Sequence, residues 1–292
     1  MNVDIAFSKF KELHIVDPGG NTREVAQSLL YVLRNVSSVP WKINMVSNYD
    51  IHCEDILYIF IWVACTDVFP VYYIIYQVEP TALLNRYYYR KILSNAYYIW
   101  DYSYSNIKYL SDKGISAVFF PISYTPYISN PEILSGNLMY DDSYKDIDVL
   151  FLGHDHCWPR RLKIKEELIN IGIKYFQATN FKLDEMKNVI KRAKICLNVH
   201  AFNHSCLEVV RLNILLSNQS VVLSEFTYDY GFDPAVNKYS NAVHFCKYNN
   251  IVKTCINLLK DFEYRRELAH KSYSWYSNRP WANIAKNTQL II

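Results

Sequence analysis

The chain has 292 residues, of which 51% are hydrophobic and 20% charged, and its formal net charge at pH 7 is +3. This balance is that of a globular protein and excludes a disordered or fibrous chain. Because the small positive charge is dispersed, we expect no nucleic-acid partner. The length suits one large domain or two modest ones, and either can bury a substantial core.

The cysteines and the longest apolar run indicate the cellular compartment of the protein and whether it spans a membrane. The seven cysteines form no Cys-x-x-Cys pair and are odd in number, so a reducing compartment fits better than a disulfide framework. No basic stretch precedes a long apolar core near the N-terminus, so no signal peptide is expected. The longest apolar run, residues 56–65, is too short to span a bilayer. We therefore expect a cytoplasmic protein without a transmembrane segment.

The first half of the chain alternates strand patterns with helix patterns. Apolar runs predict strands at residues 13–17, 41–46, 56–62, 72–78, 96–100 and 117–120. Helices are predicted between them at residues 22–35, 81–93 and 103–110. Such alternation is typical of a parallel sheet with helices on both faces.

A linker is predicted at residues 125–146, which contain proline, serine, asparagine and glycine. The alternating pattern then resumes, with strands at residues 148–152, 173–176, 195–199, 220–223 and 242–245, and helices at residues 160–171, 182–192, 206–216 and 249–273. The predicted fold is α/β, with two Rossmann-like, doubly wound parallel-sheet domains facing a central cleft. We expect these domains at residues 1–140 and 141–273, and residues 274–292 packing back on the first domain.

Ligands in such sheets bind beyond the carboxyl ends of the strands, which directs attention to the loop from Gly153 to Arg161. Gly153 permits close backbone approach, and the start of a helix is positive. Arg160 and Arg161 add planar hydrogen-bond donors suited to phosphate, so the loop is a candidate diphosphate site. The alternative is an ordinary loop with two solvated arginines.

A second candidate site combines His200 with Glu208 and Arg211. In a cleft, Glu208 could accept both hydroxyls of a ribose, and Arg211 could orient Glu208 or meet the phosphate. The alternative is a surface ion pair worth less than about 1 kcal/mol. Ser224 and Glu225 follow at the end of a strand, where they either bound the same pocket or form a plain turn.

These segments carry a resemblance to a known group of enzymes. The stretch from Asp148 to Glu225 resembles the C-terminal half of GT-B glycosyltransferases, and more narrowly of the CgeB-like and group 1 transferases of bacteria and large DNA viruses. The matching segments are residues 153–161, 193–200, 207–211 and 221–225. In the broad superfamily two glutamates eight apart flank the nucleotide sugar. Glu208 matches the second, which holds the ribose, and His200 replaces the first.

The resemblance implies transfer of a hexose or pentose from a nucleoside-diphosphate sugar, linked to UDP or GDP, to a glycan or another protein- or lipid-linked hydroxyl. Neither a metal nor another cofactor is implied, and a viral member would act in the host cytoplasm. Residues 141–273 would bind the nucleotide sugar, with His200 contacting its sugar or phosphate. Residues 1–140 would face the acceptor, since residues 75–79 and 101–107 resemble the acceptor domain less specifically.

An inverting enzyme of this kind needs a general base from the first domain. Asp17 lies beside a Gly-Gly turn, and Glu79 and Asp101 each end a predicted strand, so all three are candidates. Each also has a structural interpretation as a helix cap or turn residue.

Three other functions remain open. The run from His154 to Cys157, with His200 and His204, suggests a metal hydrolase, although the further motifs of that class are missing. A non-catalytic nucleotide-sugar-binding protein or a nucleotide-sugar epimerase would use the same architecture. A nicotinamide enzyme is not expected, because the sequence has no Gly-x-Gly-x-x-Gly motif.

Overall fold

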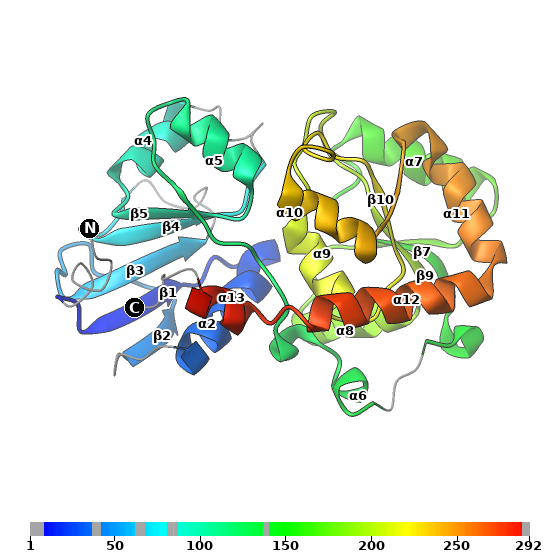
Figure 1. Ribbon diagram of the computed structural model, residues 1–292, viewed down its shortest axis with the longest axis horizontal. Coiled ribbons are helices and arrows are strands. Elements are labelled where there is room, and N and C mark those ends of the chain that lie inside the picture. The colour runs from blue at the N-terminus through cyan, green and yellow to red at the C-terminus, as the bar shows by residue number, and fades with distance from the viewer. Residues whose placement is uncertain are drawn as a thin grey trace. The chain divides into compact units, whose positions relative to one another are not determined.

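The computed structural model describes residues 9–36, 42–61, 68–80, 84, 87–136 and 140–287. The chain forms two compact units (Figure 1): unit 1 is Met1–Tyr127 with Pro280–Ile292, and unit 2 is Ile128–Arg279. Each unit holds one parallel sheet with helices on both faces, which confirms the predicted class of two doubly wound α/β domains. The sequence predicts domain boundaries after residues 140 and 273, whereas the two units are divided after residues 127 and 279.

The sheet of unit 1 has six parallel strands. Their spatial order is β2 (Lys42–Val46), β1 (Glu12–Val16), β3 (Ile56–Ile61), β4 (Tyr73–Gln77), β5 (Tyr98–Asp101) and β6 (Val118–Phe119). The strand order reverses between β1 and β3, as in other doubly wound sheets. The helices are α2 (Arg23–Val36), which follows a 3₁₀ turn at Gly20–Thr22, α4 (Tyr87–Asn95), α5 (Tyr104–Ser111) and α13 (Trp281–Asn287).

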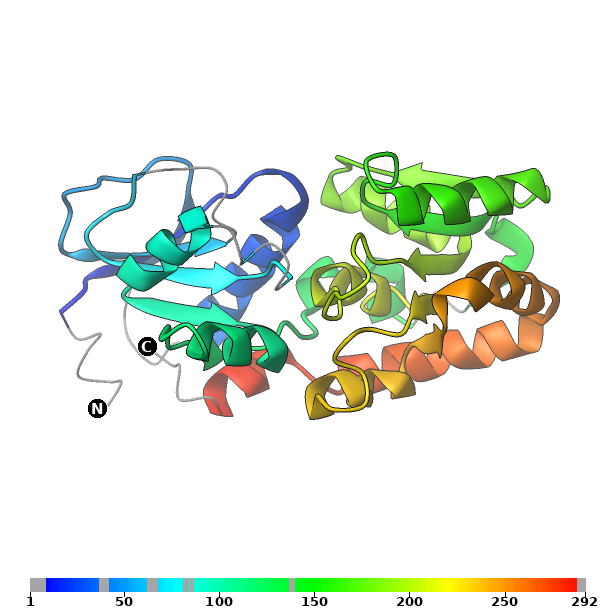
Figure 2. The same ribbon diagram turned by 90° about the horizontal axis from the view of Figure 1, so that it is seen from above.

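Successive residues of β4 face opposite sides of the sheet and divide the core of unit 1. Tyr73 and Ile75 belong to a cluster with the buried leucines of α4 and α5. Tyr76 points to the other face, where its ring centroid lies 6.1 Å from that of Trp281 in α13. Helix α13 packs on α2 there, and it lies with the elements of unit 1 in Figure 2.

The sheet of unit 2 has five parallel strands. Their order is β11 (His244–Cys246), β10 (Val222–Glu225), β9 (Ala193–Asn198), β7 (Ile147–Leu152) and β8 (Tyr175–Ala178). The α-helices are α6 (Pro131–Leu134), α7 (Pro159–Asn170), α8 (Leu183–Lys191), α9 (Val209–Leu216), α10 (Pro234–Asn237), α11 (Ile251–Lys260) and α12 (Phe262–Ser277). Short 3₁₀ turns lie at Pro126–Ile128, Asp142–Tyr144, Lys238–Asn241 and Tyr248–Asn250.

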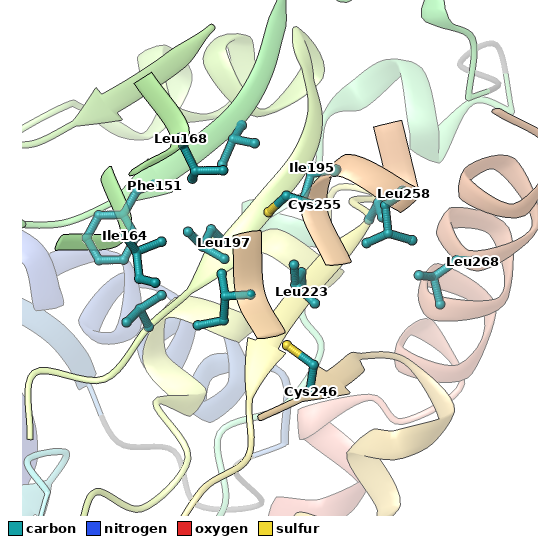
Figure 3. Packing of buried hydrophobic residues seen from close by; sticks show 14 of the residues in the cluster. Phe151, Ile164, Leu168, Ile195, Leu197, Leu223, Cys246, Cys255, Leu258 and Leu268 are labelled. Carbon is teal, nitrogen blue, oxygen red and sulfur yellow. The ribbon is translucent and has the colours of Figure 1, made fainter. Parts of the chain in front are cut away.

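A single apolar cluster fills the space between this sheet and helices α7, α11 and α12 (Figure 3). Phe151 of β7 and Leu197 of β9 meet Leu168 of α7 and Cys255 of α11 in it. Burying one such leucine or phenylalanine contributes about 1.5–3 kcal/mol. The cluster therefore fixes the strands whose ends carry the candidate site.

The stretch predicted as a linker, residues 125–146, contains the boundary between the two units after Tyr127 and also, among its described residues, three short helical segments. Asn130 caps α6 by accepting a hydrogen bond from the backbone of Glu132, and Pro131 fits the first helical position. Asn218 accepts from the backbone N–H of Asn130 and donates to the carbonyl of Ile128. These bonds attach the stretch to unit 2. Residues 137–139 lie outside the described residues.

Two predicted helices of unit 2 differ from the structure by more than one residue. The helix expected at residues 249–273 is two helices, α11 and α12, because Asp261 leaves the helical conformation and caps α12 through the N–H of Tyr264. The helix expected at residues 206–216 begins at Val209, with Glu208 at its N-cap. Trp41 and Trp62, which bounded two predicted strands, and residues 81–83 and 85–86 of a predicted helix lie outside the described residues. In the described ranges, no helix combines the length and apolarity needed to cross a membrane.

Candidate functional site

The residues predicted to bind a nucleotide sugar gather at one edge of the unit 2 sheet. Strands β7, β9 and β10 are parallel neighbours, so their carboxyl ends meet at that edge. Gly153 follows β7, His200 lies two residues beyond β9, and Ser224 and Glu225 end β10. The helices that follow these strands bring Arg160, Arg161, Glu208 and Arg211.

Glu208 is the centre of a hydrogen-bonded network. Its Oε1 accepts from Arg161 Nη2 at 2.9 Å, and its Oε2 bonds His200 Nδ1 at 2.8 Å and accepts from Arg211 Nη1 at 3.1 Å. Burial raises the pKa of this carboxyl, but the three cationic partners outweigh burial and hold the pKa far below its usual range. Glu208 is therefore ionised at neutral pH.

Glu225 makes a second, bidentate ion pair. Its two oxygens accept from Arg160 Nη1 at 3.0 Å and Nη2 at 2.6 Å. Glu225 Oε1 also accepts from the backbone N–H of His200 at 2.6 Å, and Arg160 donates to the His200 carbonyl at 3.0 Å. The Arg160 guanidinium lies 4.3 Å from the ring centroid of Tyr248. This pair therefore holds the backbone of His200 from both sides.

The other two arginines bind loop and strand carbonyls. Arg161 donates to the carbonyls of Val199 at 2.8 Å and His154 at 3.0 Å, and burial lowers its pKa to about 10. Arg211 donates to the carbonyl of Leu152 at 2.7 Å. The Arg161 guanidinium therefore remains charged at neutral pH and ties the loop after β7 to the loop after β9, while Arg211 ties the end of β7 to α9. We call Arg160, Arg161, His200, Glu208, Arg211 and Glu225 together the arginine–glutamate network.

Gly153 and Ser224 lie beside residues of this network. Gly153 has φ +124°, and a Cβ atom there would lie 3.4 Å from Arg211 Nη2, so the position favours glycine in both conformation and space. Ser224 Oγ accepts from Asn198 Nδ2 at 2.9 Å and donates to the carbonyl of Glu225. Asn198 Oδ1 in turn accepts from Arg211, so Ser224 joins the network through Asn198.

His200 presents one atom that this network leaves without a partner. The residue is 1% exposed, and within the described part of the chain its buried Nε2 has no hydrogen-bond partner. Burial alone would lower the pKa of the imidazole, but the Glu208 carboxylate raises it, and the pKa lies above its usual value. The ring is thus a buried, proton-binding group at the edge of the sheet.

The charges of the arginine–glutamate network suit an anion. Three arginines face two glutamates, which leaves one excess positive charge, or two when His200 is protonated. Partial burial strengthens the attraction of such an excess for a ligand phosphate. The structure brings all eight predicted residues together, yet it engages Arg160 and Arg161 with protein acceptors that the sequence did not indicate.

The three candidate bases lie in unit 1, at the carboxyl ends of β1, β4 and β5. Asp17 accepts from the N–H of Gly19 at 3.0 Å and pairs with Arg23 at 2.9 Å. The backbone carbonyl of Glu79 accepts from Asn106 Nδ2 at 2.9 Å. These contacts place both residues in turns beside the sheet edge.

Asp101 is fully buried, and its Oδ1 accepts from Ser103 N at 2.8 Å and Asn106 Nδ2 at 3.1 Å. Burial raises the pKa of this carboxyl well above its usual range. Asp101 thus bonds the N-cap residue and the first turn of α5, which fits the turn or cap role considered for it from the sequence.

The histidine-rich run does not converge on a metal site. Asp155 is buried and faces Lys165 Nζ at 3.2 Å and Tyr175 Oη at 3.2 Å, whereas the rings of His154 and His156 pack edge to face. Across the described residues, no three His, Cys, Asp or Glu side chains are grouped so that they could hold a metal ion.

Sequence reasoning gave no role to Asn198, which bridges Arg211 and Ser224, or to Tyr248, which stacks on Arg160. Asn198 had a usable signal, because it is a polar residue ending an otherwise apolar strand pattern. Tyr248 had none, since it lies far along the chain from its partner.

Comparisons with known proteins add to this description. No model of a known protein family matches the chain. An uncharacterized protein of Acanthamoeba polyphaga mimivirus is 27% identical over 171 residues, which are 58% of this chain and 53% of that protein. The match thus spans about half the length of that relative. The narrower resemblance to CgeB-like transferases, and a viral origin, stay predictions.

Solved structures resemble the chain over almost its whole length. Sucrose-phosphate synthase from Thermosynechococcus elongatus has a TM-score of 0.59 at 10% identity, covering 96% of this chain and 98% of that one. An α-glucosyltransferase in complex with UDP and a 13-mer DNA containing an HMU base has a TM-score of 0.61 at 10% identity, with the same coverage. A mutant of T4 phage BGT in complex with UDP-glucose has a TM-score of 0.51 at 10% identity, again covering 96% and 98%. The chain therefore has the two-domain α/β fold of the GT-B glycosyltransferases.

Proposed function

We propose that this protein is a glycosyltransferase that takes a sugar from a nucleoside-diphosphate sugar bound at the carboxyl edge of the unit 2 sheet. The observation that carries the proposal is the arginine–glutamate network, whose excess positive charge and unpartnered His200 Nε2 lie where ligands of doubly wound sheets bind. Two structures of the same fold support it, since they hold UDP and UDP-glucose.

The chemistry proposed for this network requires no metal ion. Breaking the bond between sugar and diphosphate develops negative charge on the leaving phosphate, which preorganised positive groups stabilise. Arg161 and Arg211 supply fixed charge, and the N-terminus of α9 adds a favourable dipole. Gly153, Ser224 and Glu225 would bound the pocket, and Arg160 would hold Glu225 in place.

The acceptor in this proposal is the hydroxyl of a glycan or of a protein- or lipid-linked group, activated by unit 1. Asp17 and Glu79 are the proposed bases for an inverting reaction, since Asp101 is fully buried. Two alternatives use the same binding edge: a nucleotide-sugar epimerase, which would change the sugar without an acceptor, and a binding protein, which would cause no turnover.

A thermal-shift screen of UDP, GDP and their sugars, with Mg²⁺ or with EDTA, tests the proposal. A nucleotide at 100 times its dissociation constant should stabilise the protein by roughly 2.7 kcal/mol. We expect a shift that is equal with Mg²⁺ and EDTA, disappears in Glu208→Ala and Arg161→Ala, and persists in Arg266→Ala, an exposed arginine of α12. Release of nucleoside diphosphate in the presence of acceptor glycans then separates transfer from binding.

The same screen can reject the proposal. The absence of a shift with every nucleotide tested, or a shift with the metal alone, would remove the basis for a nucleotide-sugar site. Conversion of the bound sugar with no acceptor present would favour the epimerase. Binding with neither transfer nor conversion would favour the binding protein.

A further inference from the structure

The unpartnered Nε2 of His200 stands out because every other polar group of this residue is engaged. The backbone N–H donates to Glu225, the carbonyl accepts from Arg160, and Nδ1 bonds Glu208. Leaving a buried polar atom unpaired is unfavourable, because the atom gives up its hydrogen bonds to water without replacing them. An isolated exception inside a satisfied network indicates that a ligand atom binds there.

The carboxylate of Glu208 decides what Nε2 can do. Because Nδ1 faces an ionised oxygen at 2.8 Å, Nδ1 carries a hydrogen whether the ring is neutral or charged. In the neutral ring Nε2 therefore has no hydrogen and can only accept a hydrogen bond. In the imidazolium, Nε2 becomes a charged hydrogen-bond donor. A phosphate oxygen, which only accepts, can bind Nε2 in the second state alone.

The surroundings of the ring favour that charged state. Burial lowers the pKa of the imidazole and Arg211 lowers it further, but Glu208 and Glu225 together raise it above its usual value. Asp229, in the loop after β10, also interacts with the ring electrostatically. The charged groups around His200 come from α7, the N-terminal end of α9, the end of β10 and the loop after it, and they are Arg160, Arg161, Glu208, Arg211, Glu225 and Asp229.

Glu208 itself has little capacity left for a ribose. A carboxylate offers about four acceptor sites, and three bonds from Arg161, His200 and Arg211 already occupy Glu208. A ribose diol needs two free acceptor sites, whereas one remains. The geometry therefore favours a role for Glu208 that acts through His200.

Resting on the proposed function, we propose that Glu208 is a positioning residue that keeps His200 oriented and protonated, and that the nucleotide-sugar diphosphate binds His200 Nε2–H. Binding of the diphosphate is then coupled to one proton. Above the pKa of His200, the affinity falls about tenfold for each pH unit, because each unit removes nine-tenths of the charged form.

The test is calorimetric titration of the full chain with UDP-glucose between pH 6.5 and 9, or with GDP-mannose if only GDP sugars bind. In these probes the sugar ester removes the terminal phosphate ionisation near pH 6, so the charge of the diphosphate does not change over this range. Repeating the titration in two buffers of different ionisation enthalpy measures the proton uptake directly. The wild type should take up close to one proton where His200 is neutral before binding.

The variants separate the two residues. His200→Gln should bind about tenfold more weakly or worse at pH 6.5 and lose both the pH dependence and the proton uptake. Glu208→Gln should move the fall in affinity to lower pH. Since Glu208 acts through His200, the double variant should bind no more weakly than His200→Gln alone. His244→Gln and Glu263→Gln, which lie outside the network, are the matched controls.

Several results would overturn this inference. One is a pH dependence that survives in His200→Gln. Another is a Glu208→Gln variant that weakens UDP much more than 2′,3′-dideoxy-UDP, as expected if Glu208 held the ribose hydroxyls. Wild-type protein that binds no nucleotide sugar would defeat the proposed function itself, and this inference with it. Far-ultraviolet circular dichroism shows whether Glu208→Gln is folded, and His200→Gln alone still decides the proton coupling.

Discussion

Replacing Glu225 by glutamine perturbs the ion pair that holds the backbone of His200. The glutamine would point an NH₂ group at Arg160 Nη2, 2.6 Å from the position of the lost oxygen, so two hydrogen-bond donors would face each other. Glu225 is 5% exposed and Arg160 20% exposed at their side chains. Breaking a buried ion pair costs about 3–5 kcal/mol. Because Arg160 keeps some solvent and the carbonyls of His200 and Phe202, we expect about 3 kcal/mol.

A surface ion pair of the same length supplies the matched control. Lys191 Nζ and Glu132 Oε2 are also 2.6 Å apart, but their side chains are 29% and 52% exposed. Glu132→Gln should therefore cost less than about 1 kcal/mol. The shortest distance between charged atoms is equal in the two pairs, so the comparison sets a buried, bidentate pair against an exposed pair with one bond.

Hydrogen exchange read by mass spectrometry suits this comparison, since a chain of two units need not unfold in one step. Glu225→Gln should lower the protection of peptides from β9 and β10 by about a hundredfold, and Glu132→Gln by less than about tenfold. Adding Arg160→Met should recover part of the loss, because the uncompensated charge is then removed. Equal effects of Glu225→Gln and Glu132→Gln on β9 and β10 would refute the reasoning.

Three further outcomes are expected. Gly153→Ala should destabilise unit 2 by about 1–3 kcal/mol, measured by urea unfolding, because of the positive φ and the nearby Arg211. Trp281→Ala should cost unit 1 about 3–5 kcal/mol and expose α2 to hydrogen exchange, and unchanged protection there would contradict the packing described. The raised pKa of Asp101 adds stability below the pKa of the unfolded state that is lost as the pH rises through the folded pKa. Asp101→Asn should therefore make the melting temperature of unit 1 depend less on pH, without lowering it at pH 7. Thermal melting at several pH values measures this.

The sequence predicts most strands and the edge of the sheet that carries the site. The run ending at Asn198 is apolar because β9 is buried on both faces, and such runs are visible in one dimension. The break at Asp261 is not visible in this way, since apolar residues at helical spacing continue across it. Only the cap that Asp261 makes to Tyr264 N divides the two helices.

In the candidate site, the sequence predicts which residues lie at the strand ends but not which of them pair. The rule of strand ends finds Arg160, Arg161, Glu208 and Glu225, but it cannot pair them. Their pairing crosses 65 positions between Arg160 and Glu225 and 47 between Arg161 and Glu208, and it depends on the register of β7, β9 and β10. Sequence therefore identifies arginines with the charge to bind phosphate, and the structure adds the bonds that hold Arg160 and Arg161 beside His200.

The discontinuity of unit 1 has a consequence for synthesis on the ribosome. The chain leaves unit 1 at Tyr127 and returns at Pro280, so all of Ile128–Arg279 is translated before Trp281 exists. At about 5–20 residues per second this interval lasts roughly 8–30 s. Throughout it, the faces of Tyr76 and Phe120 that Trp281 later covers lack their apolar neighbour. The nascent sheet of unit 1 thus keeps an apolar face uncovered during that interval, and the face is completed only after Trp281 has been translated.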